Sequence, residues 1–378
     1  MTPFTTVHFG RPSFTIGNSG VQVFVSIQGG HCTASFTSGR TSFSPYFVAP
    51  WWRDAPFVEL DPVLQGLRGD FFCLPFGANP DPVGGVRYPI HGRTANECWN
   101  FVRVSETPEA KDLVLSMDLT PDKGTVRKEI TLREREPVIY TRDVVEGFGG
   151  RAPIGHHPNI QCADGTATAI IDMSPFVTGF TAPVPLGTPE NKGYSMLQPG
   201  VEFKDLRKAP TQFGGTVDLS SYPIPRGYED GVLLINDPRN DFVFTALTER
   251  EKGFLYFHLK DPKVLAETLL WMPLGGNFTP PFNGRVDSVI GLEEVTGNFF
   301  YGRKASIEAN MILNRGYPTF REFSESTPAE IKLIAGAVPV DKSFKGVSDI
   351  IRKTDSEIRI VGRGGERIDV PCRTDFLK

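Results

Sequence analysis

The sequence predicts an all-β protein built as one large antiparallel β-sandwich. The chain of 378 residues contains 39 glycines and 32 prolines. Together these two residue types make up a larger share of the chain than the roughly 12% found in average proteins. These residues favour turns, and so many short strands. Segments of alternating apolar and polar residues recur, as at 21–27, which is the pattern of half-buried strands. We expect a single domain over 1–378, with N-terminal strands at 1–60 and a C-terminal hairpin at 340–378 packed on it.

The first half of the chain predicts strands on either side of an aromatic loop. Residues 45–53 combine two prolines with large aromatic rings, which excludes a central strand and indicates a loop. Strands are expected at 21–27, 31–36, 111–119, 124–135 and 137–148.

The second half is predicted to begin with long loops and to end in regular strands. Residues 174–225 are rich in Pro, Gly, Thr and Ser and show weak periodicity, so we expect little regular structure there. One helix is predicted at 345–353, with Ile350 and Ile351 facing inward, followed by a hairpin of 357–361 and 367–370. Strands are expected at 231–237, 241–248, 253–260, 267–272, 286–293, 304–314 and 329–337.

Composition and motifs exclude several functional classes. A formal net charge of -4 provides no basic surface for nucleic acid or for an anionic membrane. No apolar run approaches the roughly 18 residues of a spanning helix, and the first residues lack the pattern of a secretory signal. Five scattered cysteines without a CxxC pair favour reduced thiols and a cytoplasmic protein. Dinucleotide-binding, phosphate-binding and nucleophile-elbow motifs are absent from the sequence, so we predict no cofactor.

Residues 155–159 place two of the six histidines side by side, before a proline. On a strand, His156 and His157 would point to opposite faces, which makes joint binding of one metal awkward. We therefore predict no metal site. Pro158 restricts the preceding residue to an extended conformation, so His157 is the better candidate for a fixed general acid. The alternative is that both histidines are structural.

Further candidate residues come from both halves of the chain. Glu293 and Glu294 end an apolar strand, so alternation puts one of these carboxyls on the core or cleft side and the other on the opposite face. Burial would raise the pKa of such a carboxyl and make it a better base. A turn carries Arg87 and His91 close to Trp99, and such donors beside a ring suit a polyol. Trp271 is a second candidate for an aromatic ring that lines the polyol site; otherwise it is a core residue. Glu229 and Asp230 are expected in a solvated turn without a role.

Taken together, these segments resemble the galactose mutarotase (aldose 1-epimerase-like) superfamily. The matching features are Phe76-Gly77, Arg87 in a turn, His91-Gly92, residues 155–158 and the segment 292–297. The resemblance covers residues from about 29 to 340. Two positions depart from the family pattern, because Glu294 replaces a proline and Asn159 replaces an aromatic residue.

The resemblance implies a β-sandwich with an open sugar-binding face. It further implies that His157 protonates the ring oxygen, that Glu293 removes the anomeric proton, and that His91 and Arg87 bind hydroxyls, without a cofactor. The expected partner is a small-molecule carbohydrate; Arg53, Arg87 and Arg93 would suit an anionic sugar or a solvated surface. Two alternatives remain: a non-catalytic carbohydrate-binding protein, and a glycan-processing enzyme that uses Glu293 with Glu294 or with a distant acid. The oligomeric state is not predicted.

Overall fold

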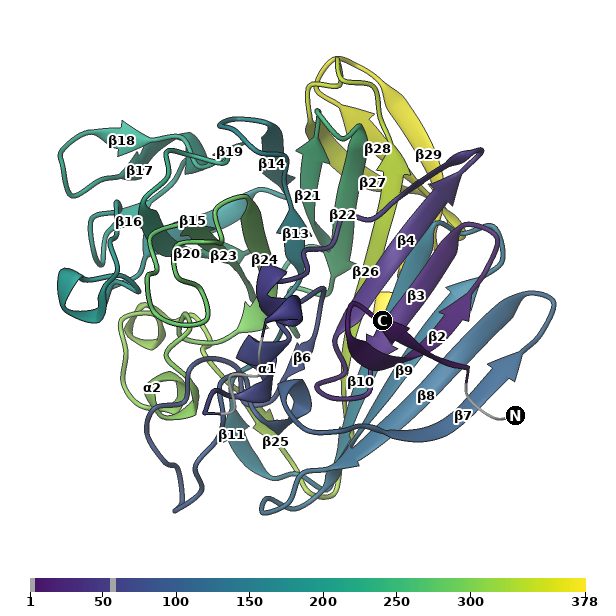
Figure 1. Cartoon of the computed structure of the whole chain (residues 1–378), viewed down its shortest axis with the longest axis horizontal. Coiled ribbons are helices and arrows are strands. Elements are labelled where there is room, and N and C mark those ends of the chain that lie inside the picture. The colour runs from purple at the N-terminus through teal and green to yellow at the C-terminus, as the bar shows by residue number, and fades with distance from the viewer. Residues whose placement is uncertain (1–3, 55–58) are drawn as a thin grey trace.

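A computed structural model describes residues 4–54 and 59–378, and two large antiparallel sheets dominate it (Figure 1). The nine-stranded sheet has the order β19 (Ser221–Tyr222), β14 (Ala169–Met173), β21 (Val243–Glu249), β22 (Phe254–Lys260), β26 (Ala329–Pro339), β10 (Val138–Glu146), β9 (Thr125–Arg133), β8 (Ala110–Asp118) and β7 (Asn100–Glu106). The eight-stranded sheet has the order β16 (Glu202–Phe203), β15 (Phe176–Thr181), β20 (Tyr228–Asn236), β23 (Glu267–Leu274), β24 (Val289–Thr296), β12 (Ile154–His156) and β6 (Phe72–Cys73), with β13 (Asn159–Gln161) also paired to β24.

Smaller sheets form at both ends of the chain. The N-terminal sheet contains β1 (Thr5–His8), β2 (Arg11–Gly17), β3 (Val21–Ser26), β4 (Cys32–Ser38) and β5 (Thr41–Phe43). The C-terminal sheet contains β27 (Val347–Thr354), β28 (Glu357–Gly362) and β29 (Arg367–Pro371). Two short ladders pair β11 (Gly150–Ala152) with β25 (Arg321–Phe323) and β17 (Ala209–Pro210) with β18 (Thr216–Val217). The α-helices of the described residues are α1 (Pro62–Gln65) and α2 (Arg303–Ile307).

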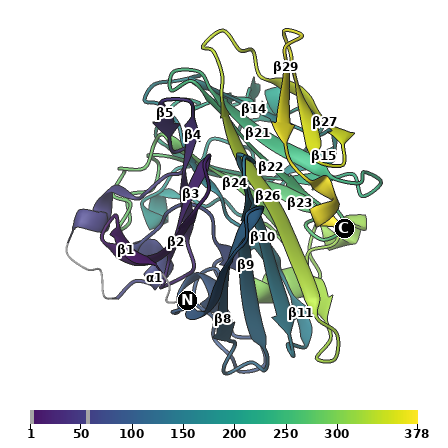
Figure 2. The same ribbon diagram turned by 90° about the vertical axis from the view of Figure 1, so that its right-hand side faces the viewer.

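Strand alternation divides the apolar side chains among three buried clusters. On β10, Ile139 belongs to the cluster shared with the eight-stranded and N-terminal sheets, whereas Val138 and Tyr140 pack under the C-terminal sheet. The N-terminal and C-terminal sheets thus lie on opposite sides of the nine-stranded sheet (Figure 2).

The third cluster covers the outer face of the eight-stranded sheet. It joins Leu233 and Leu269 of that sheet to α1 and to the predicted aromatic loop, through Val63 and Trp51. Residues 50–53 of that loop form a 3-10 turn. The outer face therefore carries a layer of loops, and this layer encloses the candidate site.

The predicted fold class is confirmed, and most predicted strands agree with observed strands within a few residues. The region 174–225 is less irregular than predicted, because it contains β15, which pairs with β20. The predicted N-terminal segment 1–60 includes residues 1–3 and 55–58, which lie outside the described residues.

Two predicted elements are wrong. Residues 345–353 form most of β27 rather than a helix, and Ile351 is exposed whereas Ile350 is buried. Adjacent residues of a strand point to opposite faces, and the register shift between Val347 and Asp349 puts Ile350 rather than Ile351 on the buried face. The sequence of this segment does not reveal such a shift. Residues 304–314 form α2 and a following turn instead of a strand; the Oδ1 atom of Asn310 accepts hydrogen bonds from two backbone amides in that turn.

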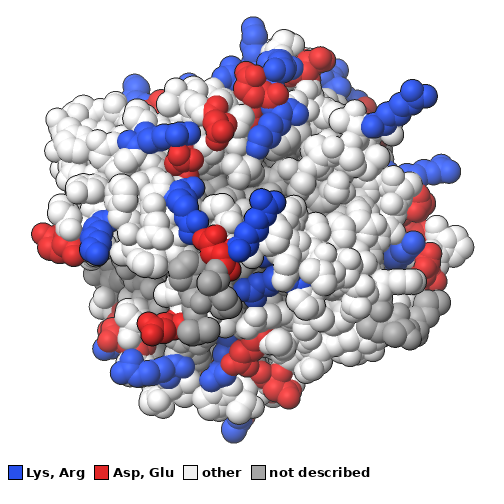
Figure 3. Space-filling view, in the orientation of Figure 1, with Lys and Arg blue, Asp and Glu red and all other residues white. Residues whose placement is uncertain are grey.

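Charged side chains of both signs are interspersed on the face seen in Figure 3. Among residues 4–54 and 59–378, no helix has the length and apolar character needed to span a membrane.

Candidate active site

His157 and Glu293 lie opposite each other on neighbouring antiparallel strands. The register pairs His156 with Glu294 on one side and Asn159 with Gly291 on the other. The residue numbers of the two partners add up to the same sum in both pairs. His157 therefore lies opposite Glu293, in the interval between β12 and β13. Directly opposed side chains on one face of a sheet are close neighbours. The Nε2 atom of His157 is 3.2 Å from Oε1 of Glu293, and both side chains are on the outer face.

Local backbone contacts fix His157 where the strand is interrupted. Pro158 cannot donate a ladder hydrogen bond, but its carbonyl accepts one from Leu292 N at 2.8 Å. The side chain of Asn159 donates to the carbonyl of His157 at 2.9 Å and to that of Gly69 at 2.9 Å. The asparagine that departs from the family pattern therefore holds the histidine backbone in place.

The pair lies in a pocket of about 290 Å³ on the outer face of the eight-stranded sheet. His91 also lines the pocket, and its ring meets that of His157 edge to face at 4.8 Å between centroids. Much of the remaining wall is apolar and comes from α1 and the covering loops: Val63, Leu64, Leu67, Leu186, Phe282 and Phe300.

Trp271 and Glu229 form a second polar contact in this pocket. The indole of Trp271 lies 5.6 Å from the His157 ring, and its Nε1 donates to Oε1 of Glu229 at 3.0 Å. Gly291 faces the pocket between Trp271 and Glu293. A Cβ at Gly291 would lie 2.8 Å from the carboxyl of Glu293 and 3.0 Å from Cβ of Trp271. Glycine at this position gives both side chains room.

Burial sets the protonation of the site. It raises the pKa of Glu293 well above its usual value. Burial, assisted by His91, lowers the pKa of His157 well below 6.5. Burial therefore disfavours the charged form of each group in the contacting pair. Burial also raises the pKa of Glu229 to about 7.

The other residue of each adjacent pair faces the space between the two large sheets. His156 Nδ1 is 3.0 Å from Oδ2 of Asp70, and its Nε2 is 3.4 Å from Asp143. Burial alone would lower the pKa of His156, but the two carboxylates outweigh it and raise the pKa to about 9. This histidine is a buried cation and does not reach the pocket.

Glu294 lies beside it in a second buried ion cluster, in contact with Lys260 and with Nε2 of His258. Burial alone would raise the pKa of Glu294, but these partners hold it at about 2. Because Glu294 faces away from Glu293, these two carboxyls cannot act together on one glycosidic bond, and this pairing is excluded for a glycan-processing enzyme.

Four predicted site residues line the pocket and two do not. His157, Glu293, His91 and Trp271 line it. Trp99 is instead 1% exposed in the core, where its Nε1 donates to the carbonyl of Thr94. Arg87 is exposed on the turn and is not among the lining residues.

Glu229 is the lining residue that the sequence reasoning missed. Gly227-Tyr228 indicated a solvated turn, but Glu229 is on β20 and is 4% exposed. The apolar run that follows it, 231–235, is the signal that could have placed it on a buried strand.

Among the described residues, no three His, Cys, Asp or Glu side chains are grouped so that they could hold a metal ion. The pocket residues that could act chemically are the two histidines and the two glutamates.

Comparisons with solved structures identify the fold of this chain. No protein-family model and no curated protein sequence matches the chain. A galactose mutarotase related enzyme from Lactobacillus acidophilus aligns with a TM-score of 0.55 at 13% identity, covering 87% of this chain and 98% of that one. A galactose mutarotase-like protein from Clostridium acetobutylicum aligns with a TM-score of 0.54 at 12% identity, covering 89% and 98%. The chain therefore has the fold of the galactose mutarotase-like proteins.

Proposed function

We propose that the protein is an aldose 1-epimerase-like enzyme that interconverts the anomers of an uncharged sugar. The observation that carries this proposal is the contact between His157 and Glu293 in an apolar pocket. A pair that shares one proton can deliver a proton to one sugar oxygen and remove one from another, which is the requirement of this reaction.

In this reaction a base removes the proton from the anomeric hydroxyl while an acid protonates the ring oxygen. The bond between C1 and the ring oxygen breaks, and an open-chain aldehyde forms. Rotation about the C1–C2 bond and the reverse proton transfers then close the other anomer. The net proton count is unchanged, so no cofactor is needed.

Glu293 is the base and His157 the acid in this proposal. Movement of the shared proton across the 3.2 Å contact converts the neutral pair into a carboxylate and an imidazolium. A polar sugar in the pocket favours this separation of charge, because its hydroxyls replace part of the lost hydration. The two side chains are neighbours on one sheet face, so the anomeric hydroxyl and the ring oxygen lie over the pair together.

The remaining lining residues bind the substrate. Glu229 and His91 are hydrogen-bonding partners for hydroxyl groups, and Trp271 offers an aromatic surface to the C–H groups of the sugar. No lysine or arginine is among the described residues that line the pocket, which contains two carboxyls. A phosphorylated or acidic sugar would therefore lack a counter-charge, and we infer that the substrate is neutral.

Exchange spectroscopy of sugar anomers by NMR tests the proposal directly. The wild-type protein should accelerate exchange of a neutral aldose, and Glu293→Gln should slow it by about 10²-fold or more while sugar binding persists. Glu308→Gln, which changes an exposed carboxyl after α2, is the matched control and should retain full activity. Binding of neutral aldoses without accelerated exchange would favour a carbohydrate-binding protein. Wild-type exchange rates in Glu293→Gln would show that the base is assigned wrongly.

A further inference from the structure

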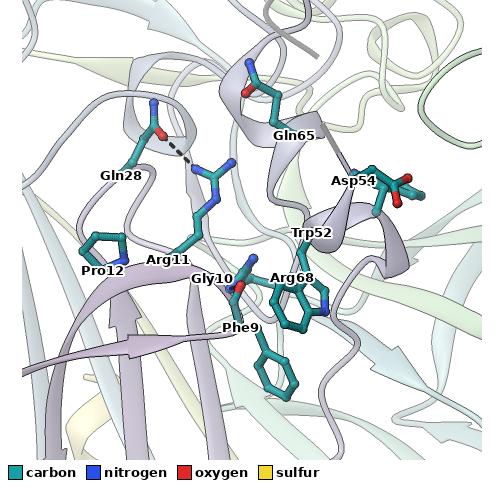
Figure 4. Close-up of a pocket in the computed structure, with 10 residues that line it drawn as sticks. Phe9, Gly10, Arg11, Pro12, Gln28, Trp52, Asp54, Gln65 and Arg68 are labelled. Atoms are coloured by element: carbon teal, nitrogen blue, oxygen red, sulfur yellow. Dashed lines mark hydrogen bonds between the residues drawn. The ribbon is translucent and has the colours of Figure 1, made fainter. Parts of the chain in front are cut away.

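A second pocket lies on the opposite side of α1 from the candidate active site. It has a volume of about 290 Å³ and is lined by side chains of the N-terminal sheet, the 3-10 turn at 50–53 and the segment around α1 (Figure 4). Gln65 and Arg68 line this pocket, whereas Val63, Leu64 and Leu67 of the same segment line the active-site pocket. The two pockets therefore have different walls and different chemistry.

Two arginines without an acidic partner define the second pocket. Within residues 4–54 and 59–378, neither Arg11 nor Arg68 forms an ion pair with a carboxylate. Arg68 is 1% exposed. Its Nε donates to the carbonyl of Gly66 at 3.0 Å and its Nη1 to that of His8 at 2.9 Å. Its Nη2 has no hydrogen-bond partner among the described residues, which is costly for a buried charged group.

The two guanidinium groups also repel each other. Burial lowers the pKa of Arg68 to about 10, and the charge of Arg11 contributes to that shift. Burial likewise lowers the pKa of Arg11. Buried cations are normally paired with carboxylates in folded proteins. A buried Arg68 beside a partly buried Arg11 at a cavity is the arrangement expected where a ligand supplies the negative charge.

Close packing holds Arg11 in position. Its Nη1 donates to Oε1 of Gln28 at 2.7 Å, which orients the guanidinium (Figure 4). A Cβ at Gly66 would lie 2.4 Å from Nε and Cζ of Arg11. The guanidinium therefore rests against a backbone position that only glycine leaves open.

The rest of the lining is compatible with an anion that carries an organic group. Asp54 also lines the pocket, but its Oδ2 accepts a hydrogen bond from Arg285 at 2.8 Å, and this partner offsets its charge. Trp52 presents an indole to the cavity, and indole rings pack well against flat organic groups.

We propose that this pocket is a binding site for a small oxyanion, a carboxylate or a phosphate, held by Arg11 and Arg68. The site is separate from the sugar pocket and does not depend on the proposed epimerase activity. Arginine is well suited to both oxyanions, because its planar donors match the geometry of their oxygens.

Calorimetric titration of the full-length protein at low ionic strength tests this proposal, with inorganic phosphate and acetate as separate probes and glucose as the uncharged control. At least one anion should bind wild-type protein with Kd of about 1 mM or below, and the stronger probe identifies the oxyanion. Arg11→Gln should weaken this binding about tenfold or more.

Two control variants locate the site. Arg53→Gln removes an exposed arginine next to Trp52 that does not line the pocket, and Glu293→Gln alters the sugar pocket. Both should change the anion affinity by no more than about twofold. Asp54→Asn removes the one carboxylate among the described residues that line the pocket and should tighten binding. Failure of both anions to bind wild-type protein, or equal losses in Arg11→Gln and Arg53→Gln, would overturn the proposal. Heat of glucose binding that depends on Arg11 would overturn it as well.

Discussion

His157 and Glu293 occupy opposed positions on adjacent antiparallel strands, with 3.2 Å between Nε2 and Oε1. Their neighbours, His156 and Glu294, are opposed in the same register but face the interior between the sheets. The same strand pairing thus places one histidine–glutamate pair in a pocket and the other in two buried ion clusters. The pocket pair is kept close to neutral by burial, whereas the interior pair is ionised by its partners.

The pH dependence of kcat/KM should show a wide plateau that extends to pH values below 6.5, because kcat/KM reports the pKa values of the free protein. The pair is active with one proton. On the acid side activity is lost when His157 takes up a second proton, and its pKa is lowered well below 6.5. On the alkaline side activity is lost when the proton leaves Glu293, whose pKa is raised well above its usual value. Anomer exchange at sugar concentrations well below KM measures this profile. Half-maximal activity already at pH 6.5 on the acid limb would contradict it.

Gly291→Ala should lower kcat/KM by about 10²-fold, because the added Cβ would lie 2.8 Å from the carboxyl of Glu293 and displace it. Gly20→Ala is the matched control, since the nearest atom to its Cβ is 3.8 Å away. Exchange kinetics and thermal unfolding of both variants should be compared. Equal activity in the two variants would mean that the carboxyl position is not critical.

Trp271→Phe should shift the pH dependence of KM to higher pH. The indole donates a hydrogen bond that lowers the pKa of Glu229, which burial raises to about 7. Without that donor Glu229 becomes a carboxylate only at higher pH. The decrease in KM that accompanies its ionisation should therefore occur at higher pH than in the wild type. Glu229→Gln should remove this pH dependence of KM. An unchanged KM profile in Trp271→Phe would separate Glu229 from substrate binding.

Stability should fall as pH rises through about 9, because His156 loses its proton there. The folded pKa lies above the unfolded value of 6.5, so this contribution is complete below pH 6.5 and is lost at higher pH. The free energy of unfolding should decrease by about 3 kcal/mol between pH 6.5 and about pH 9.5. Urea denaturation at several pH values measures it.

His156→Gln should remove most of this decrease. His8→Gln should retain it, because the pKa of His8 is lowered, chiefly by burial, and the residue is already neutral above pH 6.5. Equal pH dependence in wild type and His156→Gln would contradict the buried cation.

Local sequence patterns predicted much of the candidate acid–base pair. Alternation along strands indicated that only one of two adjacent histidines and one of two adjacent glutamates could face a pocket. Pro158 favoured His157, and the structure places His157 in the pocket. Whether His157 and Glu293 perform the assigned steps stays a prediction.

Local patterns were misleading where tertiary packing decides exposure. Trp99 is near His91 in sequence, yet its ring packs in the core below Lys128. Glu229 follows a turn-like dipeptide, yet the loops that cover β20 bury it. Ile351 was expected to be buried in a helix, and a register shift in a strand exposes it.

The sequence by itself determined the all-β class and most strands, because these depend on periodicity and residue chemistry within short segments. Pro158 favoured His157 over His156, whereas the choice of Glu293 over Glu294 came from the family resemblance. The tertiary structure alone decided which strand lies beside which, and hence that residues 136 positions apart are in contact at 3.2 Å. It also decided that Arg11 of β2 and Arg68, which follows α1, have no acidic partner among the described residues. Such relationships depend on strand register and loop packing, which no local pattern encodes.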